Sequence, residues 1–139
     1  MTEAALVATL ALATTALALS RPAAMTLLTA LFAVRVTGQV AVLVARPRWL
    51  PPMAQWNFVP YAILLPVQVA LLVAMVTLVG ASSQPAFAPV AVVYAGVMVV
   101  RYALRMWLRP NARWFGGAIP IVFHVVLAAF LYVLASDPR

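Results

Sequence analysis

The apolar residues of this sequence fall into five continuous blocks, which lie at about 3–19, 23–45, 58–81, 88–107 and 117–135. Each break joins a helix-breaking proline or glycine to polar residues, as in Ser82-Ser83-Gln84-Pro85. A helix needs about 20 apolar residues to cross roughly 30 Å of hydrocarbon, whereas the strands of a membrane barrel alternate apolar and polar residues. The pattern therefore predicts an all-α integral membrane protein, a single transmembrane domain over 1–139 with about five transmembrane helices.

The first block ends in Ala16-Leu17-Ala18, which is the kind of small-residue site at which a signal peptide is cleaved. However, its leading segment carries Glu3 and has no Arg or Lys, so we expect a first spanning helix instead. Threonines are its only polar residues beyond that segment. We therefore expect the second to fifth blocks to form a four-helix unit with a polar core, and the N-terminal helix to lie at its periphery.

Composition supports the membrane assignment and narrows the chemistry. Of the 139 residues 67% are hydrophobic and 8% are charged, too few charges for the polar surface of a soluble domain. The absence of cysteine excludes disulfides, thiolate metal sites and thiol nucleophiles. All nine basic residues are arginines, and because they lie at or inside the ends of apolar blocks we expect membrane lipids as partners and no nucleic acid.

The arginines also predict an orientation, since positive residues gather on the cytoplasmic side of a membrane. The N-terminal side holds Arg46, Arg48, Arg109 and Arg113, with Arg105 close by, whereas the opposite side holds Arg21 and Arg139. We expect a bacterial inner-membrane protein with its N-terminus in the cytoplasm and its C-terminus outside. The predicted anchors at the cytoplasmic interface are Trp49, Trp56, Trp107 and Trp114, together with Arg105, Arg109 and Arg113.

A few polar residues lie inside the apolar blocks, where they normally face the interior of a bundle. They form stripes along individual helices: Arg35 with Gln39; Asn57 with Tyr61 and Gln68; Tyr94 with Arg101 and Arg105; and the single histidine, His124. Counting inward from the cytoplasmic edge places Gln39, Arg101 and His124 at a similar depth of about 10 Å. The hypothesis is one basic ligand-binding pocket, formed by Arg35, Gln39, Arg101 and His124 with Tyr61 and Gln68.

This pocket contains no acidic residue, because the two carboxylates of the chain, Glu3 and Asp137, lie near its ends. The neutralising charge has to come from a bound anion, a lipid headgroup or a partner's carboxylate, unless water and backbone carbonyls solvate the arginines. The alternative interpretation is structural. Tyr61, Gln68, Tyr94 and His124 then join helices by hydrogen bonds, and Arg105 extends its side chain to the membrane surface.

Several functions remain open at this point, and no catalytic motif favours an enzyme. The first is an accessory subunit of a membrane complex, or a binder of an anionic amphiphile or lipid, and its expected protein partners are other membrane subunits or further copies of this chain. The second is a haem- or quinone-binding redox subunit, in which His124 needs a second ligand such as Met98 or a residue of another chain. A channel or transporter is not supported by any repeat or acidic ring.

A third function follows from a resemblance. An asparagine near the start of one helix, Asn57, then the Tyr94, Arg101 and Arg105 stripe, and then an arginine-rich loop resembles small membrane transferases that bind glutathione. In that family an acidic residue follows the asparagine closely, but here the position holds Pro60 or Tyr61. The resemblance implies a transferase, and the missing acid puts its catalytic chemistry in doubt.

Overall fold

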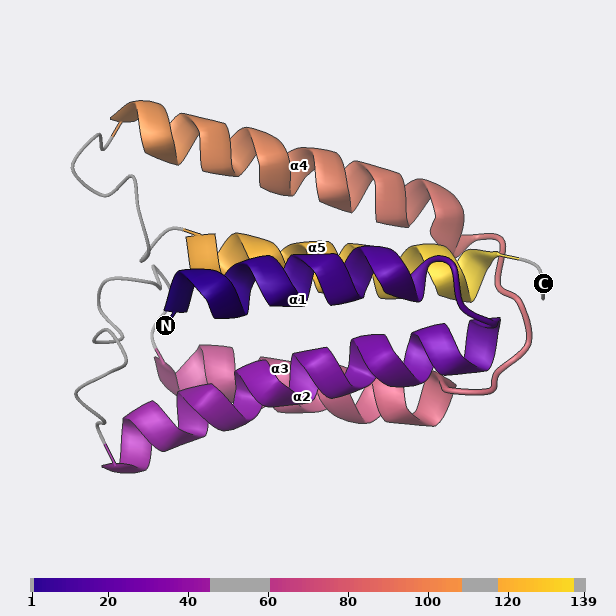
Figure 1. Cartoon of the computed structure of the whole chain (residues 1–139), viewed down its shortest axis with the longest axis horizontal. Helices are drawn as coiled ribbons and strands as arrows, with labels where there is room; N and C mark the ends of the chain where they lie inside the picture. Colours follow the sequence, from indigo (N-terminus) through magenta and orange to yellow (C-terminus); the bar gives the residue numbers. More distant parts are fainter. Residues whose placement is uncertain (1, 46–60, 109–117, 137–139) are drawn as a thin grey trace.

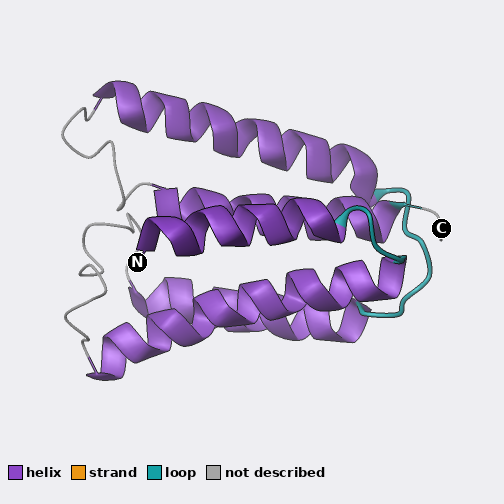
Figure 2. Ribbon diagram, in the orientation of Figure 1, coloured by secondary structure: helices purple, strands orange, loops and turns teal. Residues whose placement is uncertain are grey.

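The computed structural model describes residues 2–45, 61–108 and 118–136, and all of its regular secondary structure is helical (Figure 1, Figure 2). The helices are α1 (Thr2–Ala16), α2 (Arg21–Ala45), α3 (Tyr61–Leu78), α4 (Phe87–Leu108) and α5 (Ala118–Ala135). The prediction of an all-helical chain with five helices is confirmed. Two of the helices, α2 and α4, are long and apolar enough to cross a membrane.

The helix ends follow from local chemistry. The Ala24 amide donates to the Ser20 carbonyl at 2.8 Å, so α2 begins directly after Ser20. Pro22 lies in the first turn, where its missing amide hydrogen costs no hydrogen bond within the helix. Gly80 follows the end of α3 with a φ of 84°, a left-handed conformation that terminates helices. The predicted third helix, which extends to residue 81, is therefore three residues too long at this end.

The five helices run antiparallel in chain order, so their ends separate into two groups (Figure 1). The N-terminus, the end of α2, the start of α3, the end of α4 and the start of α5 lie together, and the other helix ends lie at the opposite side (Figure 1). This arrangement agrees with the alternation of sides that the arginine pattern assumes.

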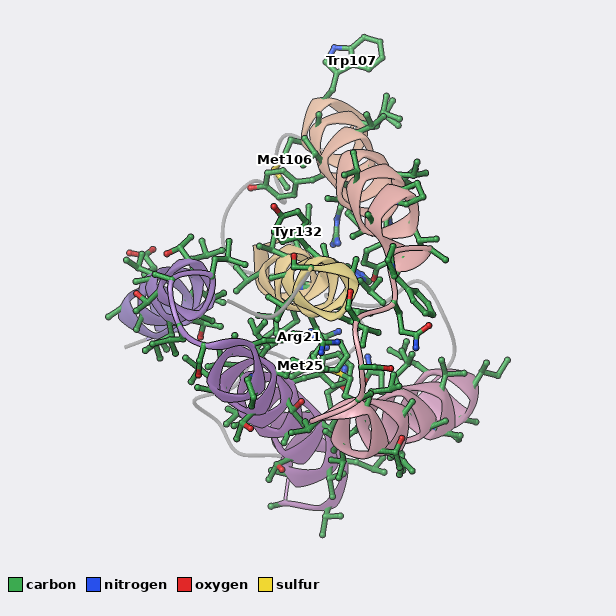
Figure 3. The ribbon with its side chains drawn as sticks, turned by 90° about the vertical axis from the view of Figure 1, so that its right-hand side faces the viewer. Arg21, Met25, Met106, Trp107 and Tyr132 are labelled. Atoms are coloured by element: carbon green, nitrogen blue, oxygen red, sulfur yellow. The ribbon has the colours of Figure 1, made fainter. Side chains whose placement is uncertain are left out.

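The core of the bundle lies around α5, which packs against α1, α2 and α4. Viewed end-on, α5 is central, and Arg21 and Met25 of α2 point toward it (Figure 3). The largest fully buried apolar side chains come from α2 and α5: Met25, Leu28, Val126, Phe130 and Leu134. α1 adds Ala13 and Ala16 to this core, and α3 adds Met75.

The helices differ in how far they are covered by their neighbours. α1 packs against both α2 and α5, whereas α3 packs mainly against α2, and α4 packs mainly against α5. Among the described side chains, α1 buries only Ala13 and Ala16 and α4 buries only Ala91, and residues such as Val92 and Trp107 are largely exposed. Both α1 and α4 therefore lie at the outside of the bundle (Figure 3).

The far end of α5 is tied to the start of α2. Arg21 donates hydrogen bonds to the carbonyl oxygens of Val133 at 3.2 Å, Leu134 at 3.1 Å and Ala81 at 2.6 Å. The Ser83 hydroxyl donates to the last carbonyl of α5, that of Ala135, at 3.2 Å. Because the last carbonyls of a helix carry partial negative charge and lack intrahelical partners, a guanidinium is well suited to bind them.

Candidate polar site around α4 and α5

A hydrogen bond between two side chains joins α4 to α5 near the middle of the bundle. The Tyr94 hydroxyl is bonded to Nδ1 of His124, and the two rings meet edge to face with centroids 5.7 Å apart. Both residues are half-buried. The prediction that Tyr94 and His124 join helices through hydrogen bonds is confirmed. The same contact fixes the register of the two helices.

Arg101 also lies near His124, because both residues line one small cavity between α4 and α5. Along α4, Arg101 comes seven residues after Tyr94, the residue bonded to His124. Arg101 and Arg105 occupy the last two turns of α4.

Two hollows border Arg101 and Arg105. The first is a small cavity of about 20 Å³ between α4 and α5, which these arginines share with Met98, Tyr102, Ile121 and His124. A cavity of this volume has room for a water molecule. The second is an open groove of about 730 Å³ beside α4, whose described lining comes from α4 alone and is almost entirely apolar.

The groove on α4 is defined by one stripe of the helix surface. Its lining residues are Gly96, Val97, Val100, Arg101, Leu104, Arg105 and Leu108. At 3.6 residues per turn, Gly96 and Val100 lie along one edge of the stripe, and the two arginines lie along the other. The arginine edge is the one nearer α5, since both arginines also border the small cavity. The result is an apolar groove with positive charge on one side.

Arg35 approaches the same region from α2. Its guanidinium lies over the ring of Phe123 on α5, with 5.2 Å between the Cζ atom and the ring centroid, and the residue is buried. This is within the distance of a cation–π contact. The positive charges of Arg35 and Arg101 both act on Tyr94 and on His124. Three helices therefore bring two cations and a Tyr-His pair within electrostatic range of one another.

Gln39 and Gln68 are also buried, but they line neither hollow. Gln39 lies one turn from Arg35 on α2, and Gln68 lies on α3, which packs against α2. Arg101 and His124 lie between α4 and α5, and Arg35 reaches α5 from α2 through Phe123. Gln39 and Gln68 lie apart from the two hollows, on the buried faces of α2 and α3.

The remaining predicted positions fall partly outside the described residues. Trp107 is 77% exposed and points away from the bundle (Figure 3), in a suitable position for an interface anchor. Tyr61 is the first residue of α3, and its side chain is outside the described part of the structure. The other predicted anchors and the start of the asparagine stripe lie entirely outside the described residues: Trp49, Trp56, Asn57, Arg109, Arg113 and Trp114.

One important residue had no place in the predicted site. From the sequence, Arg21 is predicted only to be one of the two arginines on the non-cytoplasmic side, although its side chain binds three carbonyl oxygens. Its position directly after Ser20, at the start of a helix, was the available signal. A cation at a helix start is unfavourable for its own helix and indicates that it serves another group.

The site does not fit a metal or a haem. Within the described ranges, no group of three or more His, Cys, Asp or Glu side chains could hold a metal ion. Met98, the expected second haem ligand, lines a cavity together with His124, but at about 20 Å³ this cavity is far smaller than a haem. Comparison of the chain with protein families, with curated proteins and with solved structures found no match. The function therefore has to be argued from the residues alone.

Proposed function

We propose that this chain is an integral membrane protein that binds an anionic amphiphile, such as a phospholipid, along α4. The acyl chain lies in the apolar groove, and the anionic head lies against Arg101 and Arg105. The observation that carries the proposal is this pair of arginines at one edge of a groove whose other lining residues are apolar or glycine.

The exposed surface supports the membrane environment. Large apolar side chains are exposed on every helix, including Val7 of α1, Val44 of α2, Val73 of α3, Val92 of α4 and Val125 of α5. Soluble monomers rarely expose continuous apolar surface of this kind, whereas lipid covers it without cost. α3 and α5 have 18 residues each, within the length of about 17–25 residues with which helices cross a bilayer. By length, these features support spans by α2, α3, α4 and α5, whereas α1 has 15 residues and is shorter than that range.

The charges support an anionic head. The chain has nine arginines against two carboxylates, and Glu3 lies at the exposed start of α1. Guanidinium groups bind phosphate oxygens with charge-assisted hydrogen bonds, which are stronger than neutral ones. Because Arg101 and Arg105 lie near the end of α4, their heads reach the depth of lipid phosphates while the groove continues toward the middle of the membrane.

Native mass spectrometry of the protein extracted in mild detergent tests the arginine pair. The wild type should retain one anionic lipid in preference to phosphatidylcholine when both are supplied in nanodiscs. The double variant Arg101→Gln, Arg105→Gln should retain it about tenfold less or worse, because two charge-assisted contacts are lost. The matched variant Arg101→Lys, Arg105→Lys keeps both charges and should retain an intermediate amount.

A second variant tests the groove. A Cβ built at Gly96 meets nothing within 4 Å, so Gly96→Leu fills the groove without displacing protein atoms. Lipid retention should fall. Gly38 on α2 has the same free space, and Gly38→Leu is therefore a control that should leave retention unchanged. If the protein instead survives only in a larger assembly, with another protein chain and no lipid, the accessory-subunit function replaces this one.

A further inference from the structure

Two buried carboxamides carry polar atoms that no described group satisfies. Gln39 is fully buried, and neither its Oε1 nor its Nε2 has a hydrogen-bond partner among the described residues. Gln68 is 6% exposed, and its Oε1 likewise has no partner within the described ranges. A buried polar atom without a partner costs more free energy than an ordinary hydrogen bond contributes, so such atoms are nearly always paired in folded proteins.

The two glutamines belong to adjoining helices and to the same half of the bundle. α2 and α3 pack against each other in opposite directions. Gln39 lies six residues before the end of α2, and Gln68 lies seven residues after the start of α3, at the same end of the bundle. Both glutamines therefore lie in the half of the bundle nearer to that end. Both face inward, since both are buried.

The unpaired atoms define the chemistry of the missing partner. Gln39 offers one donor, Nε2, and one acceptor, Oε1, and Gln68 offers a second acceptor. A carbonyl or an anion could satisfy the donor alone and would leave both acceptors unpaired. A water molecule has two hydrogens and two lone pairs, so it can accept from the donor and donate to both acceptors, and two neighbouring hydroxyls of a polyol can do the same. If the oxygen and nitrogen positions of either amide are exchanged, the set of unpaired atoms still contains at least one donor and one acceptor.

We infer that Gln39 and Gln68 together bind a hydroxyl-bearing ligand between α2 and α3. The hydroxyl is supplied either by a trapped water molecule or by the polyol headgroup of an amphiphile. This site is separate from the groove on α4, and it does not depend on the function proposed above. The ligand is bound between two helices and so joins α3 to the rest of the bundle. This contact matters for stability because α3 packs mainly against α2.

Replacing each glutamine with methionine, which is similarly long and unbranched, tests the inference through the thermal unfolding midpoint. If the hydroxyl is bound, Gln39→Met and Gln68→Met each lower the midpoint by about 3 °C or more. The double variant should lose less than the sum of the two, because both residues share one ligand. Gln84→Met is the matched control, since the Gln84 side chain is exposed, and it should leave the midpoint unchanged.

An unchanged or raised midpoint in Gln39→Met overturns the inference, because removing an amide that truly lacks a partner relieves its desolvation cost. If the variants do not fold, the wild type gives the answer through nuclear Overhauser effects from its glutamine side-chain amides. Overhauser effects between these amides and water protons identify a bound water molecule. Overhauser effects between the amides and the CH protons of glycerol identify a polyol lipid, provided that these signals disappear when the lipid is removed by exhaustive detergent exchange. The absence of both overturns the inference.

Discussion

The hydroxyl of Tyr94 is bonded to Nδ1 of His124, and this contact lies one turn from Ala91, the fully buried residue of α4. Together the two contacts position a helix whose other side chains are mostly exposed. The bond also uses one ring nitrogen of the sole histidine, so Nε2 is the nitrogen that remains for the cavity shared with Arg101 and Arg105.

Tyr94→Phe should therefore destabilise the protein by about 1–2 kcal/mol, because the half-buried imidazole nitrogen loses its partner while the ring contact remains. The measurement is the free energy of unfolding in a denaturing-detergent titration. Tyr132→Phe, at an exposed position of α5, is the control and should change little. A Tyr94→Phe protein as stable as the wild type would show that the hydrogen bond does not hold α4 in place.

Arg21→Lys should destabilise the protein by about 2 kcal/mol although the charge is kept. Lysine lacks the planar fork with which the guanidinium reaches Ala81, Val133 and Leu134 at the same time. Hydrogen exchange gives a local measurement, since the Gln84 amide donates to the Leu134 carbonyl at 3.0 Å and should exchange faster in the variant. Arg101→Lys, at an exposed arginine, should leave that amide protected.

The orientation can be measured directly, because the chain contains no cysteine to interfere. Ser82 lies between α3 and α4, and Leu108 is the last residue of α4, at the opposite end of the bundle (Figure 1). In intact cells a membrane-impermeant maleimide should label Ser82→Cys, and it should label Leu108→Cys only after permeabilisation. The cysteine-free wild type is the negative control, because it should not be labelled. The reverse pattern would invert the predicted orientation, and labelling of both in intact cells would exclude a span between them.

The number and approximate extent of the helices could be predicted because apolar blocks and breakers are local features. Helix ends were less predictable where the residues near them are also apolar. The first block continues to Leu19, yet α1 ends at Ala16, because the amides of Leu17, Ala18 and Leu19 form tight turns to carbonyls three residues earlier. Nothing in the side chains of these residues distinguishes a turn from another helical turn.

The candidate site could be predicted residue by residue but not as a unit. Depth counting identifies which polar side chains are inside, since burying them is costly, and Arg35, Gln39 and Gln68 are indeed buried. It does not identify which helices touch. In the structure α3 packs mainly on α2, and α4 packs mainly on α5. Those pairings depend on long-range packing, which single-helix patterns do not encode.

The contact between Arg21 and the end of α5 also orders the events of biosynthesis. α2 leaves the ribosome long before α5, so the Arg21 guanidinium is made well ahead of the carbonyls of Val133 and Leu134 that it will bind. Until α5 is made, that charge has to stay hydrated. Closure of this end of the bundle is thus a late step of synthesis, and a chain interrupted before α5 leaves the Arg21 guanidinium without these carbonyls.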